Sequence, residues 1–512
     1  MLRGLSLAVI VIFVFVLVLQ KLFGWLFHSI ISARTSALCK EHPKLCRLTV
    51  NMVIGLSAFG LLMIFNDSAL VMDAEDASMD WMMEMHAGII PPTTPPFVWL
   101  DIDNKTYNDW DEPLFTPRYR LKNLINAAVD AKARLIVVDI DVSQPTPVET
   151  SQLHPSDQVL KTYLQDYVTE CKQKKDKSAC PPILLVRAFH SQPAPVPRTG
   201  FLEEVVKQGA PYVYWASAEF YKAEDQVARR WKLWQPACTT NQQPIVVPSI
   251  ELLAMAEVKN DCSIEEIQSK LIDVLPESCG NDNNDVSSLD VAQPKTITLC
   301  KLDIDTDFKG VRQRIMYSMS WLVEDEPPDL PHVVSDNKNN AILSIYSAKA
   351  YAESPPQASV KKLTGSIVVI GGSYSDGRDI HLTPLEEMPG ALIIINAIHS
   401  LLEYRTIDPL PIWQKLLITA ILVIIISLLL MCFTSFWSMV LLGVLVIFVV
   451  LPLSIFLFRY GIWLDFALPL LVIQIHQMST DFNKFRSEFL EKNSDLMIKK
   501  STGKWWKFNC GK

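Results

Sequence analysis

Two pairs of acidic residues in the middle of the chain have the spacing that ligand sites use. Asp101 and Asp103 end one apolar run, and Asp139 and Asp141 end a second. Residues two apart in a strand share a face, and ligands usually bind where parallel strands end. The pattern predicts up to four carboxylates at one sheet edge. They could bind a divalent cation, a proton or a cationic ligand, because close like charges raise each other's pKa. Alternatively, they cap the following helices and bond loop amides.

A second candidate site follows a later apolar run, residues 366–370. Its residues are Gly371, Gly372, Arg378, Asp379, His381, Thr383 and Asn396. The two glycines could form a tight turn whose free amides face an anion, with both signs of charge beside it. Asn396 interrupts an apolar helix and needs partners if buried, so we expect it to hold a loop or a ligand. Alternatively, the segment is a scaffold that joins the last strand to a helix leading towards the membrane.

Familiar catalytic motifs are missing from the sequence. It contains no P-loop, no cyclase or kinase signature, and no GxSxG, HExxH or CxxC motif, and its nine histidines do not cluster. We therefore predict that the chain is not an enzyme of a familiar class and binds no cofactor. Whether it binds a metal stays open, and an enzymatic outer domain is a third alternative.

The elements that must position these residues alternate between apolar runs and helical patterns. The expected strands are residues 97–102, 135–140, 183–186, 213–215 and 366–370, and the expected helices are 118–131 and 391–403. Strands that are apolar throughout and separated by helices are typical of a sheet buried on both faces. The middle of the chain is therefore predicted to be an α/β domain with a largely parallel sheet and flanking helices.

Five apolar stretches are long enough to cross a membrane, each close to the ~20 residues that a helical span needs. They are residues 5–27, 48–65, 412–431, 437–458 and 462–478. The first could instead be a signal peptide. The predicted organisation is a first span with a short basic loop (1–47), a second span (48–65), an outer domain (66–410), a bundle of three spans (411–478) and a basic tail (479–512).

Charge predicts the orientation of these spans. Lys and Arg dominate the loop between the first two spans and the tail after the last one, and such segments stay in the cytoplasm. Five spans then place the N-terminus and residues 66–410 outside and the C-terminus inside. The net charge of -8 lies mostly in the middle of the chain, which excludes a nucleic-acid-binding protein.

Cysteine usage agrees with an outer domain. Six cysteines fall inside it: Cys171, Cys180, Cys238, Cys262, Cys279 and Cys300. In an oxidising compartment they predict three disulfides, with fifteen possible pairings. A local bridge between Cys171 and Cys180 is the first choice, because the two bracket a short charged loop. Alternatively, some of the six are buried thiols.

The tail carries Phe482, Phe485 and Phe489 at helical spacing among basic residues, followed by Trp505 and Trp506. This pattern fits an amphipathic helix at the inner leaflet, where Trp and Lys are favoured. It also fits a docking helix for a cytoplasmic partner.

The order of these motifs resembles the type-two CHASE domain, over about residues 66–478. The shared features are an acidic and apolar helix (SMDWMMEM), the strand WLDIDNKTY, Thr116-Pro117-Arg118 opening a helix, the strand IVVDIDVS and the run from IVVIGGSYSDGRDIHLTP to MPGALIIINAIHSLL. Its strongest part is carried by Asp379, Thr383, Pro384, Pro389, Gly390, Asn396 and Ala397. The resemblance implies an extracytoplasmic sensory module of bacterial receptors, usually followed by three spans and a cytoplasmic kinase, cyclase or phosphatase.

Two departures from the family shape the functional prediction. An extra span precedes the usual first one, and a short tail stands where the output domain is expected. We therefore expect a sensor or adaptor in a bacterial inner membrane, with its large domain in the periplasm, that signals through a separate membrane or cytoplasmic protein partner. It would contact the lipid bilayer and could form a homo-oligomer. The alternative is a structural subunit of an envelope complex.

Overall fold

We describe a computed structural model of the chain. The residues that it describes are 69–86, 95–148, 152–174, 179–190, 195–260, 262–275, 296–306, 311–321, 332–335, 341–353, 360–407, 411–432 and 443–458, with residues 52, 60, 279, 440 and 441 in addition. The chain divides into two compact units. One is built mainly from Asp80–Asp408, and the other mainly from the segments outside that range.

The first unit is organised around a seven-stranded sheet. Its strand order is β13 (His332–Ser335), β14 (Ala341–Ser347), β1 (Phe97–Ile102), β15 (Ile367–Gly372), β2 (Leu135–Val138), β3 (Ile183–Val186) and β6 (Val213–Ala216). The last six are mutually parallel and β13 pairs antiparallel with β14. The predicted mixed α/β domain with a largely parallel sheet is confirmed.

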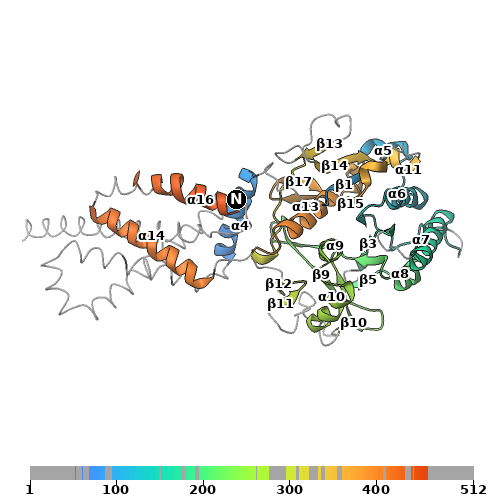
Figure 1. The fold of residues 1–512 in the computed structure, drawn as a ribbon, viewed down its shortest axis with the longest axis horizontal. Helices are drawn as coiled ribbons and strands as arrows, with labels where there is room; N and C mark the ends of the chain where they lie inside the picture. The colour runs from blue at the N-terminus through green and yellow to red at the C-terminus, as the bar shows by residue number, and fades with distance from the viewer. Residues whose placement is uncertain are drawn as a thin grey trace, which may run out of the picture. The chain divides into compact units, whose positions relative to one another are not determined.

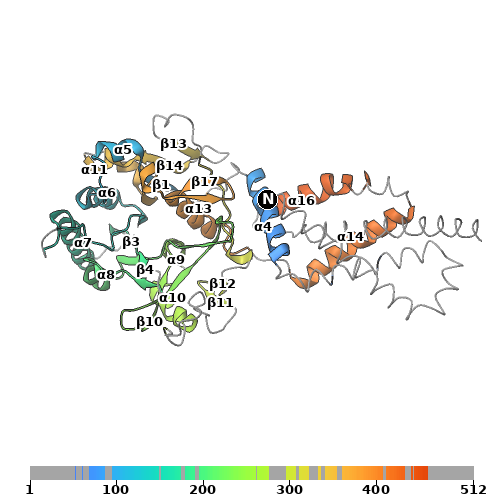
Figure 2. The ribbon, with the colours of Figure 1, turned by 180° about the vertical axis from the view of Figure 1, so that it is seen from behind.

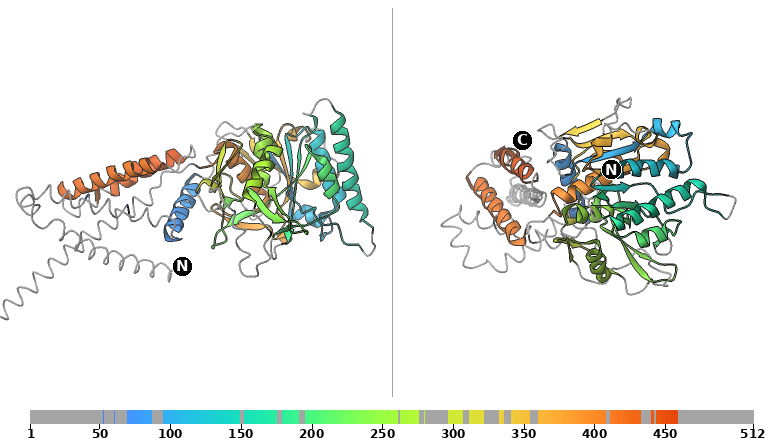
Figure 3. Two further views of the ribbon diagram at one scale, coloured as in Figure 1. Left: turned by 90° about the horizontal axis from the view of Figure 1, so that it is seen from below. Right: turned by 45° about the vertical axis from the view of Figure 1, so that its right-hand side comes forward.

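Helices cover both faces of this sheet (Figures 1 and 2). One face carries α6 (Arg118–Asp130), α7 (Pro155–Gln173), α8 (Glu203–Gly209) and α11 (Ala348–Glu353). The other carries α9 (Ile250–Lys259) and α13 (Gly390–Glu403), which pack on β2 and β15 and on each other. The view from below shows the sheet between these layers (Figure 3). Burial on both sides explains why the central strands are apolar throughout.

The remaining elements of this unit are short. Five two-stranded hairpins are β4 (Phe189–His190) with β5 (Val196–Pro197), β7 (Phe220–Lys222) with β8 (Ala228–Trp231), β9 (Trp234–Cys238) with β10 (Pro244–Pro248), β11 (Thr296–Leu299) with β12 (Leu302–Asp305), and β16 (Ile380–Thr383) with β17 (Glu386–Pro389). The short helices are α5 (Asn104–Asp109), α10 (Ile264–Leu271), η2 (Ile272–Val274), η3 (Val311–Gln313), η4 (Lys361–Leu363) and η5 (Ser375–Gly377). None of these hairpins is predicted from the sequence.

Three disulfides join the six cysteines of the domain. Cys171 pairs with Cys180, as predicted. The other pairs are Cys238 with Cys279 and Cys262 with Cys300. Both tie the hairpin region between β6 and β13 to itself, so the bridges stabilise the part of the domain that lies outside the central sheet.

The described part of the second unit contains α14 (Ile412–Cys432), a π-helical turn (Val446–Val450) and α16 (Leu451–Phe458). Helix α4 (Ala69–His86) begins in this unit, and the first unit starts at Asp80 within it. Within the described residues, one helix is long and apolar enough to cross a membrane, Ile412–Leu429. It matches the third predicted span. A shorter apolar helix, Gly443–Phe458, falls in the fourth, and the other three predicted spans lie almost wholly outside the described residues.

Candidate functional site at the carboxyl edge of the sheet

Two of the four predicted acids lie on either side of one glycine. Asp101 pairs in register with Gly371. Asp139 follows Val138, the partner of Ile370, and its backbone N–H donates to the Ile370 carbonyl at 2.8 Å. Asp101, Gly371 and Asp139 therefore stand side by side at the carboxyl ends of β1, β15 and β2, with no side chain between the two acids.

Gly371 is needed for close packing rather than for a turn. It lies within β15, so the predicted tight turn at Gly371 and Gly372 does not form. A Cβ atom on Gly371 would lie 2.7 Å from the Cβ of Ala391 and 3.3 Å from that of Asp139. Real Cβ atoms do not approach that closely, so only glycine lets the start of α13 pack on the end of β15. Gly372 is covered in the same way by the ring of Tyr374.

Asp101 is a buried acid with half of its hydrogen-bonding capacity unused. Its side chain is 3% exposed, and Oδ2 accepts a hydrogen bond from the Ser373 hydroxyl at 2.6 Å. Oδ1 is enclosed and has no hydrogen-bond partner among the described residues. Burial raises the pKa of Asp101 to about 8, the charge of Asp103 adds to the effect, and the bonds from Ser373 oppose it.

Asp139, which is half-buried, and Glu251 each have one enclosed carboxyl oxygen. Asp139 Oδ2 and Glu251 Oε2 are both buried without a hydrogen-bond partner in the described part of the chain. Burial, followed by the charges of Asp379 and Glu251, raises the pKa of Asp139 well above its usual range. Glu251 is 1% exposed in the first turn of α9. Burial raises its pKa to about 7, against the opposing effect of a hydrogen bond from Ser249.

Asp379, which directly precedes β16, and His381, which lies in β16, reach the same region. The carboxylate of Asp379 lies against Gly390, the first residue of α13, where any side chain would collide with it. Its Oδ1 is 2.9 Å from Nε2 of His381, and both side chains are partly exposed. The start of α13 therefore lies beside two carboxylates, Asp139 and Asp379, which the positive end of a helix favours.

The other two predicted acids bond nearby backbone N–H groups, and Asp141 also pairs with Arg198 at 3.7 Å. Asp103 caps α5, because its Oδ1 accepts from the Thr106 N–H at 2.6 Å. Asp141 is exposed, and its Oδ1 accepts from the Ser143 N–H at 2.9 Å and from the Ser143 hydroxyl. The capping alternative therefore describes Asp103 and Asp141, while Asp101 and Asp139 face the enclosed edge.

Asn396 holds a chain segment against α13. Its Oδ1 accepts from the N–H groups of Ser318 and Met319, each at 3.0 Å, and its Nδ2 donates to the Met319 carbonyl at 2.9 Å. Ser400, one turn further on, accepts from the Met316 N–H at 2.8 Å. A polar stripe on a buried helix thus satisfies the backbone of residues 316–319, which is the scaffold role predicted for Asn396.

Thr383 and Arg378 take no part in the enclosed edge. Thr383 is buried in the turn between β16 and β17, where its hydroxyl donates to the Glu386 carbonyl at 2.6 Å and accepts from the Leu385 N–H at 3.1 Å. Arg378 is exposed at the end of η5, with a left-handed backbone at φ 51°. The structure therefore brings together Asp101, Asp139, Gly371 and Asp379, with His381 at the rim.

Residues 53–432 match the family model for the CHASE2 domain. The chain belongs to the CHASE2 family. CHASE2 domains are extracellular sensory domains found in signalling proteins. Comparison with curated proteins and with solved structures gives no match. The three disulfides agree with a CHASE2 domain outside the cytoplasm, since such bonds persist in oxidising compartments.

A buried arginine fixes the loop after β2 in this CHASE2 domain. Arg118, the first residue of α6, is 3.7 Å from Asp157 and donates from Nη2 to the Asp141 carbonyl at 2.9 Å. Asp157 in turn accepts from the N–H of Thr146 at 2.6 Å. Charge-assisted bonds of this kind are stronger than neutral ones, so they hold Asp139 and its loop in place.

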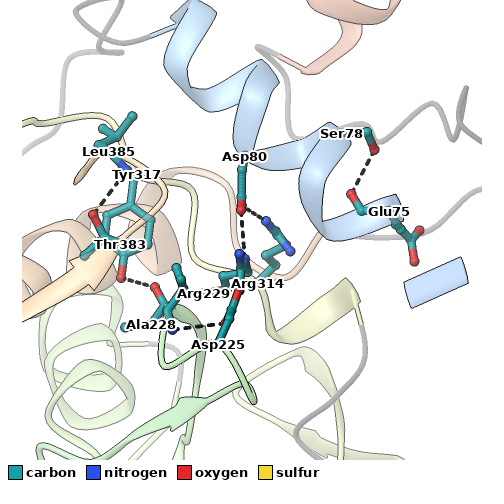
Figure 4. A network of polar contacts seen from close by, with 11 residues as sticks. Glu75, Ser78, Asp80, Asp225, Ala228, Arg229, Arg314, Tyr317, Thr383 and Leu385 are labelled. Atoms are coloured by element: carbon teal, nitrogen blue, oxygen red, sulfur yellow. Dashed lines mark hydrogen bonds and ion pairs between the residues drawn. The ribbon is translucent and has the colours of Figure 1, made fainter. Parts of the chain in front are cut away.

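A second ionic network joins helix α4 to the hairpin region of the CHASE2 domain (Figure 4). Asp80 accepts from Arg229 Nε at 2.8 Å with one oxygen and pairs with Arg314 through the other. Asp225 also binds Arg229, at 2.7 Å. Arg314 is fully buried and Arg229 nearly so. Burial alone would lower the pKa of Arg229, but the carboxylates of Asp80 and Asp225 raise it.

Glu251 and Asp80 are not predicted from the sequence. Glu251 follows the Ser249 cap and precedes a run of apolar residues, LLAMA. The sequence feature that could have identified Glu251 is an acid at the start of an otherwise apolar, buried helix. Such an acid either caps the helix or has a function. Asp80 lies in the acidic and apolar run SMDWMMEM, but nothing local indicates that its partners come from β8 and from residue 314.

Proposed function

We propose that this chain is a non-enzymatic sensor of a bacterial inner membrane, whose CHASE2 domain detects a periplasmic ligand and signals through a separate protein. The observation that carries the proposal is the enclosed edge of the sheet. Three carboxyl groups there, Asp101, Asp139 and Glu251, each keep one oxygen without a hydrogen-bond partner among the described residues. A folded domain maintains such groups at a free-energy cost.

A sensor requires a conformational state whose free energy a ligand can lower, and the buried acids provide one. A ligand shifts a conformational equilibrium only if it interacts differently with the two states. A ligand that neutralises or bonds the enclosed acids lowers the free energy of the state in which they are buried. The start of α13 lies beside Asp139 and Asp379 and is the first element to be affected.

The proposed topology has five spans, with the basic tail in the cytoplasm. The long apolar helix α14 and the apolar helix Gly443–Phe458 support two of the spans. The excess of Lys and Arg in the first loop and in the tail supports the orientation. The partner would be recruited by the tail or by that loop.

The alternative is a structural subunit of an envelope complex. The hairpin region between β6 and β13 favours it, because two of the three disulfides stabilise a surface that the central sheet does not need. Such a region could serve as a binding platform for another envelope protein.

Purification of the full chain in a mild detergent separates the two functions. A sensor should appear as a monomer or small homo-oligomer, and Asp139→Asn should change the activity of the cytoplasmic pathway with which the chain is co-expressed. A subunit should appear in a stoichiometric complex that Asp139→Asn leaves intact, with no effect on that pathway. The second result would refute the sensor proposal.

A further inference from the structure

The enclosed acids at the sheet edge come from three elements of the domain. Asp101 ends β1, Asp139 follows β2, and Glu251 lies in the first turn of α9. Asp101 and Glu251 are 3% and 1% exposed, and each has one carboxyl oxygen that finds no partner within the described ranges. Burying a carboxylate whose oxygen has no hydrogen-bond partner costs free energy, and the group lowers that cost by taking up a proton.

We propose that Asp101, Asp139 and Glu251 are separate proton-binding groups, through which the CHASE2 domain responds to the pH outside the membrane. This inference rests on the proposed sensor function and names its ligand. The proton is the one cation that needs no additional space, because it converts each enclosed oxygen into a neutral hydroxyl group.

The surroundings favour a proton over a metal ion. Among the described residues, no three His, Cys, Asp or Glu side chains are arranged to hold a metal ion. The charges that act on the acids are also negative: Asp103 acts on Asp101, and Asp379 and Glu251 act on Asp139. Neighbouring negative charges disfavour a second ionised carboxylate and so promote proton uptake.

The other titratable groups around the site come from the elements packed against it. Tyr317, from the segment that Asn396 holds, is buried within range of the charges of Arg314 and Glu251. His381 bonds Asp379 on the rim, and Ser373 bonds Asp101. Arg314 and Arg229 are the cations that act on Tyr317, and both are paired with Asp80. The acids therefore lose their negative charge by binding protons.

The direction of the pH response follows from the raised pKa values. Burial raises the pKa of Glu251 to about 7 and that of Asp101 to about 8. The folded domain then binds more protons than the unfolded chain, so its stability is greatest at low pH. Stability falls as pH rises from the unfolded values near ~4 through about 8. Charges then appear on both sides of Gly371, at the start of α13.

The test uses the full chain in lipid nanodiscs and three preparations: wild type, Asp101→Asn with Glu251→Gln, and the control Glu224→Gln. Asn and Gln imitate the neutral acids without titrating, and Glu224 is an exposed acid of the same domain. Infrared absorption of protonated carboxyl groups is recorded from pH 5 to 9, together with the midpoint of thermal unfolding.

We expect wild type and control to lose the protonated-carboxyl band between pH 6 and 9, with the unfolding midpoint falling over the same range. The double variant should lack most of this band, and its midpoint should depend on pH by less than about half as much. If wild type has no such band at pH 6, or the double variant matches it, the proton site is refuted. If the double variant fails to fold, the same comparison is made between wild type and Glu251→Gln alone. The proton site is then refuted if the wild type has no protonated-carboxyl band at pH 6 or if Glu251→Gln leaves the band unchanged.

The failure of this inference is distinguishable from the failure of the sensor proposal. A titrating band combined with pathway activity that ignores both external pH and Asp139→Asn would leave the proton site standing and refute the sensor. Pathway activity that responds to a solute at constant pH, without the band, would keep the sensor and refute the proton site.

Discussion

At the scale of single residues, the close approach of α13 to the sheet depends on Gly371. Gly371→Ala should destabilise the domain by about 1–3 kcal/mol, because the new Cβ would lie 2.7 Å from that of Ala391 and the backbone of β15 or α13 would have to shift. Urea unfolding of the outer domain measures the change. Ala391→Gly in the same chain should recover part of the loss, after allowing about 1 kcal/mol for glycine in a helix. Additive effects of the two substitutions would contradict a direct collision.

Asn396 gives a second prediction at this scale. Asn396→Ala removes the acceptor for two backbone N–H groups and the donor to one carbonyl, all buried. Each buried group left without a partner costs about 1–3 kcal/mol, so we expect a loss of several kcal/mol and faster amide exchange at Ser318 and Met319. Ser400→Ala, which removes a single acceptor, is the matched control and should lose less. Equal losses would show that Asn396 does not hold the segment.

Some of the site residues are predictable from the local sequence, and others are not. Asp101 and Asp139 are predictable because acids that end two buried parallel strands must meet at one edge. Asp103 and Asp141 are not, because a neighbouring N–H competes for each carboxylate and sequence alone does not say which partner wins. Glu251 completes the cluster from α9, and its approach depends on how that helix packs on the sheet.

At the scale of elements, the ion pairs of Asp80 decide how α4 is held. Asp80→Asn leaves the buried guanidinium of Arg314 and that of Arg229 without one of their carboxylates. Breaking a buried pair by removing one partner costs about 3–5 kcal/mol. Hydrogen exchange along residues 80–86 should accelerate, and the unfolding free energy should fall by that amount. Glu84→Gln, an exposed acid one turn away, should leave both measurements unchanged. If Asp80→Asn lowers the unfolding free energy no more than Glu84→Gln does, the ion pairs contribute little to stability.

The elements differ in how well their sequences predict them. The expected strands 97–102 and 183–186 coincide with β1 and β3, since strands buried on both faces are recognisable as apolar runs. The hairpins β7–β8 and β9–β10 contain Arg229, Gln235 and Pro236, and they are two-stranded. Their formation depends on packing against the rest of the domain rather than on a local pattern, so sequence reasoning misses them.

At the scale of the whole molecule, the disulfides should not contribute equally. Cys238–Cys279 closes a separation of 41 residues, and Cys171–Cys180 closes 9. Because the entropy removed from the unfolded chain grows with loop length, replacing the first pair by Ser should cost about 1 kcal/mol more than replacing the second, within the usual 2–4 kcal/mol. Chemical unfolding of the two double variants under oxidising conditions measures the difference. A larger loss for Cys171 with Cys180 would contradict the entropic account.

The contact between β15 and α13 has a mechanical consequence for the molecule. Gly371 and Ala391 have no side-chain torsion angles, so neither residue can absorb a displacement by changing rotamer. A long side chain at this contact would change its rotamer when the end of the sheet moves, and α13 would then stay in place. Here a shift of a few tenths of an ångström at the end of the sheet must be taken up by the backbone of α13. The junction is therefore stiff, and a displacement of the end of the sheet moves the start of α13 by a similar distance.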